Sequence, residues 1–141
     1  STLGARETVC EFGAGTFPDG LAFDVAGGAW VTSIVSNRVV HVAADGTQTI
    51  WLEDVDHDHL AVVEQAYQAG SMGRPHLDGV RSRRLCNISN LAFGGRDLKT
   101  AYLGCLLGDA IASFAMPVAG HRLPHWNADI SPLLAGKGFA P

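Results

Sequence analysis

The residue best placed for chemistry is an aspartate between a proline and a glycine. Asp19 lies between Pro18 and Gly20 and precedes the apolar segment 21–23. This context readily forms a type I or type II turn, in which an aspartate commonly bonds its own backbone. A carboxylate at the start of a strand is also suited to bind a hard cation. The residues alone favour the turn, and the metal ligand is the second interpretation.

A further group of potential metal ligands lies in the middle of the chain. Segment 54–59 reads Asp-Val-Asp-His-Asp-His, and two histidines two residues apart can serve a site in a loop. The segment lacks the glycine and the distant glutamate of an EF-hand loop. Because acids near a helix start are stabilised by the helix dipole, we interpret the segment as a polar helix N-terminus.

Two other segments carry weaker signals. His121 and His125, beside Trp126, are candidates to line a pocket, although such spacing is more typical of surface packing. Residues 87–89 match the Asn-x-Ser glycosylation pattern, but their neighbours predict the start of a buried strand. We assign no chemistry to either segment.

The elements that position Asp19 are expected to be short strands joined by tight turns. Turn residues at 24–28, 36–37 and 44–46 separate apolar segments, as in antiparallel hairpins. A leading strand is expected at residues 7–12, and residues 13–19 are expected to form a loop. Four sequential strands then make one blade-like sheet, at residues 21–23, 29–33, 38–42 and 47–52.

A helix is expected within residues 54–70. Leu60, Val63 and Ala66 recur at helical spacing. Asp56 or Asp58 is suited to cap the start of the helix, and Gly70 follows its expected end. Residues 71–84 are polar and predict a loop.

The strand pattern of the first unit returns in the second half. Segment 91–93 repeats the Leu-Ala-Phe of segment 21–23, and Ser89 lies where Asp19 lies in the first copy. The repeat predicts an all-β fold, about two blades of a β-propeller, each a four-stranded sheet, with one inserted helix. We expect one partial propeller domain over residues 1–141: a first blade at 17–53, a helical insertion at 54–85, a second blade at 86–120, and a tail with one short strand at 121–141.

Composition limits the classes of partner. Charged residues make up 17% of the 141 residues and the net charge is −4, without the basic face that nucleic-acid binding needs. The low charge suggests that something outside this chain covers some faces. No segment predicts a membrane span.

The cysteines and aromatic residues complete the expected core. The three cysteines lack disulfide-framework or zinc-type spacing, which favours a reducing compartment and a cytoplasmic location. Cys86 and Cys105 lie in apolar contexts and are expected to be buried thiols. The aromatic residues expected in the core are Phe23, Trp30, Trp51 and Phe93.

The repeated unit resembles the senescence-marker-protein/gluconolactonase family of regucalcin-like proteins. The similarity is carried by FPDGLAFD at residues 17–24 with GAWV at 28–31, and by LAFGGRDLKTAYL at 91–103. It covers most of residues 7–120, and the two motifs in this order are moderately specific. The second motif belongs to the family's last blade, so the chain is similar to the C-terminal part of such a protein.

The resemblance implies a six-bladed propeller that binds one divalent cation and hydrolyses lactones or related esters. Calcium is the first expectation, with zinc or manganese as alternatives, and Asp19 is implied to be both a metal ligand and the catalytic base. The family's other two ligands have no counterpart here, and Ser89 cannot replace a carboxylate. The expected partners are a small lactone or ester and the missing blades, from the same protein or from other chains. The alternative is a non-catalytic propeller segment that binds a partner or self-assembles.

Overall fold

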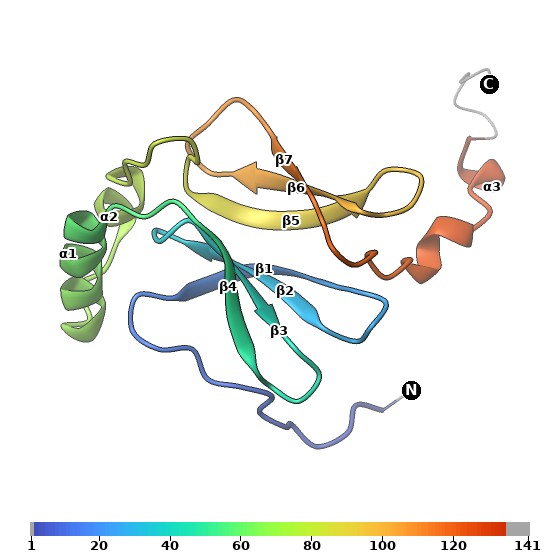
Figure 1. Cartoon of the computed structure of the whole chain (residues 1–141), viewed down its shortest axis with the longest axis horizontal. Coiled ribbons are helices and arrows are strands. Elements are labelled where there is room, and N and C mark those ends of the chain that lie inside the picture. Colours follow the sequence, from blue (N-terminus) through green and yellow to red (C-terminus); the bar gives the residue numbers. More distant parts are fainter. Residues whose placement is uncertain (1, 135–141) are drawn as a thin grey trace.

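The first half of the chain forms a four-stranded antiparallel sheet (Figure 1). The computed structural model describes residues 2–134. The strands follow one another across the sheet as β1 (Phe17–Phe23), β2 (Ala29–Ile34), β3 (Arg38–Val42) and β4 (Gln48–Glu53). The four predicted strands are confirmed, but β1 begins at Phe17, inside the segment for which the sequence predicts a loop.

Left-handed backbone at the turns allows these strands to reverse tightly. Gly27 and Gly46 have φ angles of 85°, and Asn37 has a φ angle of 46°. Glycine reaches such angles without a steric cost, and asparagine tolerates them better than most residues. The resulting register places Trp30 opposite His41, with their ring centroids 4.5 Å apart.

The second half forms a separate antiparallel sheet of three strands, β5 (Ile88–Gly94), β6 (Thr100–Cys105) and β7 (Ala112–Ala115). Segments 21–23 and 91–93 therefore lie in the first strands of two different sheets, as the repeat predicts. The expectation of a four-stranded second sheet is wrong for the residues described. Beyond β7 the chain crosses to the first sheet, where Gly120 pairs with Asp24, instead of returning beside β7.

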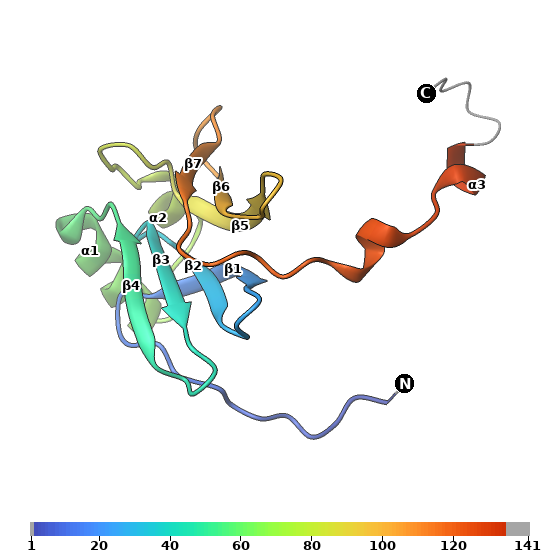
Figure 2. The ribbon, with the colours of Figure 1, turned by 45° about the vertical axis from the view of Figure 1, so that its right-hand side comes forward.

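The two sheets pack face to face, with β5–β7 lying over β1–β4 (Figure 2). Trp30 is 1% exposed, and its ring meets that of Phe93 edge-on, with the centroids 6.4 Å apart. Each large side chain buried in such a core contributes about 1.5–3 kcal/mol. The buried members of this cluster are Trp30, Val39, Ile88, Leu91, Phe93, Ala101, Leu103 and Met116.

Two helices cover one end of the first sheet (Figure 1). The predicted helix is confirmed as α1 (His57–Gln68), and Gly70 follows it with a φ angle of 67°. The predicted loop at 71–84 is wrong in part, because it contains α2 (Arg74–Asp78). Pro75 in the first turn of α2 has a φ angle suited to a helix start. The buried apolar cluster below the helices consists of Val35, Leu60, Val63 and Val80.

The predicted strand at residues 7–12 is wrong, since these residues form no strand. Cys10 and Phe12 instead pack on the outer face of the first sheet, against valines of β2 and β3. The side chain of Gln48 donates a hydrogen bond of 2.9 Å to the carbonyl oxygen of Glu11. The alternating pattern therefore reflects burial of one side of the segment on a sheet, without pairing to a strand.

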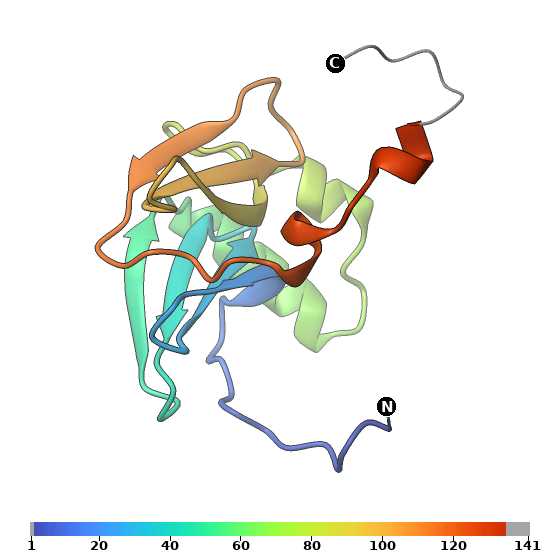
Figure 3. The same ribbon diagram turned by 90° about the vertical axis from the view of Figure 1, so that its right-hand side faces the viewer.

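After β7 the chain runs across the first strands of both sheets and then away from them (Figure 3). It contains a 3₁₀ turn, η1 (Pro124–Asn127), and the short helix α3 (Ser131–Leu134). The strand predicted for the tail does not occur in residues 121–134, and residues 135–141 lie outside the described part. Among residues 2–134, no helix has both the length and the apolar character needed to cross a membrane.

Three of the residues predicted to be buried are exposed. Phe23 is 55% and Trp51 is 46% exposed, because β1 and β4 are the outer strands of their sheet. Cys86 is exposed because it lies in the connection ahead of β5. Cys105 is half-buried, whereas Trp30 and Phe93 are buried as predicted.

Candidate functional site

Asp19 lies in a bulge within β1. Pro18 pairs with Ser33 and Leu21 pairs with Val31, so Asp19 and Gly20 together oppose Thr32 of β2. The hydroxyl of Thr32 accepts a hydrogen bond of 3.1 Å from the backbone nitrogen of Gly20 and lies 3.2 Å from its carbonyl oxygen. Because a bulge redirects the side chains beside it, this arrangement fixes the backbone from which the exposed Asp19 side chain projects.

Gly20 brings the start of β1 against the start of β5. A Cβ atom at this position would lie 2.5 Å from the carbonyl oxygen of Ser89 and 2.8 Å from the Cα of Asn90. Only glycine permits this approach. Ser89 occupies the matching bulge of β5, so Asp19 and its equivalent in the second copy begin neighbouring strands.

Two asparagines join the sheets behind this point. The side-chain oxygen of Asn87 accepts a bond of 2.7 Å from the backbone nitrogen of Val35. In return, the side-chain oxygen of Asn37 accepts a bond of 2.9 Å from the backbone nitrogen of Ile88. Both asparagines are fully buried and have left-handed backbone. The pair therefore fixes the turn between β2 and β3 to the start of β5.

A groove of about 450 Å³ runs along β1 and β5 beneath the C-terminal segment. Its wall is mainly apolar, with Leu21, Phe23 and Leu91 on the strands. His121 and Trp126 line it from the C-terminal side, and the backbone nitrogen of His121 donates a bond of 2.8 Å to the carbonyl oxygen of Phe23. Two of the three pocket candidates near the C-terminus thus share one groove, and His125 is not among its lining residues.

The residues described do not fit a complete divalent-cation site. Within residues 2–134, no group of three or more His, Cys, Asp or Glu side chains is placed to hold a metal ion. Asp19 supplies one carboxylate, and the neighbouring bulge supplies the neutral hydroxyl of Ser89. A cation at this position would need ligands from another segment.

The acidic and histidine-rich segment 54–59 has structural roles. The carboxylate of Asp56 caps α1 by accepting a bond of 3.1 Å from the backbone nitrogen of His59. The carboxylate of Asp54 accepts bonds of 2.8 Å from the backbone nitrogens of Arg84 and Leu85. Burial raises the pKa of Asp54, but these bonds, together with the backbone bond and charge of Arg83, leave the pKa below its ordinary value. The interpretation as a polar helix N-terminus is confirmed.

Sequence reasoning missed a buried carboxylate, Asp24, which is 2% exposed. Its Oδ1 accepts bonds of 2.8 Å from the backbone nitrogen of Ala26 and 2.9 Å from that of Gly28. Its Oδ2 accepts a bond of 2.8 Å from the indole nitrogen of Trp30 and lies 3.2 Å from Nε2 of His41. Burial alone raises the pKa of Asp24, but these hydrogen bonds outweigh it and lower the pKa.

A signal for this role was present in the sequence. Asp24 directly follows segment 21–23 and precedes Gly28 and Trp30, whereas the second copy has Gly94 after segment 91–93. The carboxylate is therefore specific to the first copy of the repeat. Asp24 therefore orients Trp30 in the core of the first unit alone. Its burial separates it from any substrate, so Asp19 remains the exposed acid at the junction of the sheets.

In comparisons with known proteins, no protein-family model and no curated protein matches the chain. Fold and site define the class only as an all-β chain of two packed antiparallel sheets, with one exposed carboxylate at the bulged start of β1.

Proposed function

We propose that the chain forms two consecutive blades of a β-propeller and contributes Asp19 to a metal-dependent hydrolase of lactones or related esters. The observation that carries the proposal is the place of Asp19 in the bulge of β1, where Gly20 packs against β5. In a radial array of sheets the first strands line the axis, so a side chain at the start of one faces its neighbours. The resemblance of residues 17–24 and 91–103 to the gluconolactonase family supports the same assignment.

An apolar row across the first sheet supports a ring that is completed by further blades. Leu21, Val31, Val40 and Ile50 are aligned across its four strands. The two valines are buried, partly under the N-terminal segment, whereas Leu21 and Ile50 are 56% and 54% exposed. Apolar surface of this kind usually marks a face that another element covers. A preceding blade would cover the exposed ends of the row, Leu21 and Ile50.

The expected role of Asp19 is that of a general base. A carboxylate here can accept the proton of a water molecule that attacks the lactone carbonyl, and can return that proton to the ring oxygen as the C–O bond breaks. Oxygen ligands favour a hard cation, which makes calcium the first choice, with zinc or manganese as alternatives. Since this chain supplies a single carboxylate at the site, the remaining ligands belong to the missing blades, which other copies of the chain contribute in the associated form.

A second candidate function is a non-catalytic segment that binds a partner or self-assembles. The exposure of Leu21, Phe23, Ile50 and Trp51 supports it, because these residues belong to the outer strands of one sheet. Both functions require association through this sheet, and only the hydrolase requires the carboxylate of Asp19.

The experiment compares lactone opening with assembly state. Sedimentation velocity establishes the protein concentrations at which the chain associates, and ring opening of a small δ-lactone is then followed with calcium above and below that range. Hydrolysis by the associated form, reduced about 100-fold in Asp19→Asn through loss of the base, is the expected result. Asparagine has nearly the same size, so association and the unfolding midpoint of the variant should be unchanged.

His57→Ala is the control, because His57 is an exposed residue of the first turn of α1 and its loss should leave hydrolysis intact. Full activity in Asp19→Asn would refute the role of that residue. An associated chain that opens no lactone, with or without calcium, would favour the binding segment.

A further inference from the structure

Two cysteines from different elements meet at the far end of the second sheet. Cys105 is the last residue of β6, and Cys86 lies two residues before β5. The backbone nitrogen of Leu107 donates a bond of 3.1 Å to the carbonyl oxygen of Cys86. This bond continues the pairing of the two chain segments beyond the regular strands, so both cysteines are held beside the same turn.

Gly108 lies between the two thiols. A Cβ atom on Gly108 would be 3.0 Å from the sulfur of Cys105, 3.2 Å from the sulfur of Cys86 and 2.9 Å from the Cβ of Cys86. Both sulfurs therefore border one small volume, which is open because residue 108 has no side chain. Neither cysteine has a covalent partner in the structure.

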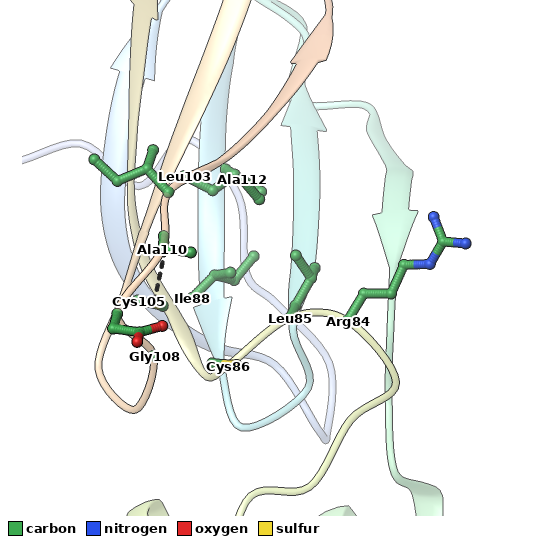
Figure 4. Close-up of a pocket in the computed structure, with 11 residues that line it drawn as sticks. Arg84, Leu85, Cys86, Ile88, Leu103, Cys105, Gly108, Ala110 and Ala112 are labelled. Carbon is green, nitrogen blue, oxygen red and sulfur yellow. Dashed lines mark hydrogen bonds between the residues drawn. The ribbon is translucent and has the colours of Figure 1, made fainter.

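The two thiols are also reached from outside. They line a cavity of about 140 Å³, whose floor includes Ile88 and Leu103 (Figure 4). Cys86 is exposed, whereas Cys105 is half-buried and its sulfur lies 3.4 Å from the carbonyl oxygen of Ala110. A small oxidant can therefore meet Cys86 first, with Cys105 close behind it.

We propose that Cys86 and Cys105 form a redox modification site that closes to a disulfide on contact with a peroxide. The Cys86 thiolate attacks a peroxide oxygen, the O–O bond breaks, and a sulfenic acid and hydroxide form. The Cys105 thiolate then attacks the Cys86 sulfur, the S–S bond forms, the S–O bond breaks, and the oxygen leaves as hydroxide. The two hydroxide ions take up the two protons that the thiols released on ionising, which gives two water molecules. Each sulfur gives up one electron, and one hydrogen peroxide is reduced to two water molecules.

To form the S–S bond, the side chains of Cys86 and Cys105 rotate into the space beside Gly108. A disulfide needs the sulfurs about 2 Å apart, and the two residues lie at the end of a strand and in a connection, outside the packed core. The disulfide would tie residues 79–87, which follow α2, to the turn after β6. This site is independent of Asp19 and of the hydrolase proposal.

The test exposes the full chain to one equivalent of hydrogen peroxide and then blocks the remaining thiols by alkylation. Intact mass, thiol titration and peptide mapping are the measurements. We expect the loss of two of the three free thiols, a mass lower by two hydrogen atoms, and a peptide that joins Cys86 to Cys105. Dithiothreitol, added to the oxidised chain before alkylation, should restore all three thiols. Cys10→Ser is the matched control and should form the same link.

Two further variants separate the reaction from simple exposure of a thiol. In Cys105→Ser the link should be lost and the sulfenic acid on Cys86 should react with dimedone. In Gly108→Ala a methyl group fills the space between the sulfurs, so the link should be lost although both cysteines remain. Circular dichroism checks that each variant keeps its sheets.

Oxidation of Cys86 to a sulfinic acid without loss of the Cys105 thiol in the unmodified chain would overturn the proposal. Links that join two chains, or that involve Cys10, would also overturn it. Unchanged formation of the Cys86–Cys105 link in Gly108→Ala would refute the assignment of the space beside Gly108.

Discussion

Replacement of Asp24 by asparagine tests the buried hydrogen-bond network that orients Trp30. The carboxylate accepts bonds from two backbone nitrogens on one oxygen, while the other oxygen accepts the indole bond and faces His41. Asparagine keeps the shape but replaces one acceptor oxygen by an amide donor. Whichever way the amide is oriented, its NH2 group replaces one of the two acceptor oxygens. The N–H donors on that side then face another donor and have no acceptor.

The expected cost follows from the number of buried donors that lose their acceptor. Each such donor costs about 1–3 kcal/mol, so a pair of them costs roughly 2–6 kcal/mol. Since a domain of this size is stabilised by only about 5–15 kcal/mol, Asp24→Asn removes a large fraction of the stability. Trp30 lies at the centre of the core, so the substitution affects both sheets.

Urea unfolding at one fixed protein concentration, followed by tryptophan fluorescence, measures the effect. Asp45→Asn is the control, because Asp45 is an exposed turn residue whose carboxylate accepts a bond from the backbone nitrogen of Thr47. The control should unfold at the urea concentration of the unmodified chain, and Asp24→Asn at a clearly lower one.

The pH dependence gives an independent check. The folded state holds the pKa of Asp24 below its ordinary value, so the unfolded chain binds more protons between the folded and unfolded pKa values. Stability is therefore lost as the pH falls from about 4, the unfolded value, through the folded pKa. Asp24→Asn should lack this part of the acid dependence. Equal urea midpoints for Asp24→Asn and the unmodified chain would refute the network as a source of stability.

Three other changes follow from particular interactions. Gly20→Ala should lower the thermal unfolding midpoint, because its Cβ would meet a backbone oxygen of β5 at 2.5 Å, whereas Gly13→Ala, with nothing within 4 Å, should leave the midpoint unchanged. Asp56→Ala should cost about 1 kcal/mol through loss of the helix cap, measured by urea unfolding, and Asp56→Ser should restore most of it. Asn87→Ala should cost roughly 1–3 kcal/mol in the same assay, because it leaves the buried backbone nitrogen of Val35 without an acceptor; an unchanged midpoint would contradict the bridging role of Asn87.

The strands of the first sheet could be predicted because turn residues and apolar segments agree there. The predicted strand at 38–42 matches β3 residue for residue. Residues 7–12 show why the same reasoning fails elsewhere. Alternation of apolar and polar residues predicts only that one side of a segment is buried. Cys10 and Phe12 are packed on the face of a sheet, without pairing to a strand. Whether a neighbouring strand edge is available is a property of the whole fold.

The sequence also failed to predict which apolar residues are exposed, because burial too depends on the whole fold. Phe23 and Trp51 have the hydrophobic character of core residues, yet they lie on the outer strands of their sheet and remain 55% and 46% exposed. Within the candidate site, the place of Asp19 beside segment 21–23 could be predicted from the turn residues around it. The close approach of Gly20 to β5 could not, because it depends on how two sheets distant in sequence pack.

The reciprocal bonds of Asn37 and Asn87 have a consequence for cooperativity. The repeat in the sequence suggests two autonomous modules, but each sheet supplies the acceptor for a backbone nitrogen of the other. A fragment containing one sheet would leave the amide of Val35 or of Ile88 without the side-chain acceptor that the other sheet supplies. The two halves should therefore unfold together despite the helical segment between them, and the amide hydrogens of Val35 and Ile88 should exchange with solvent only when the whole unit opens.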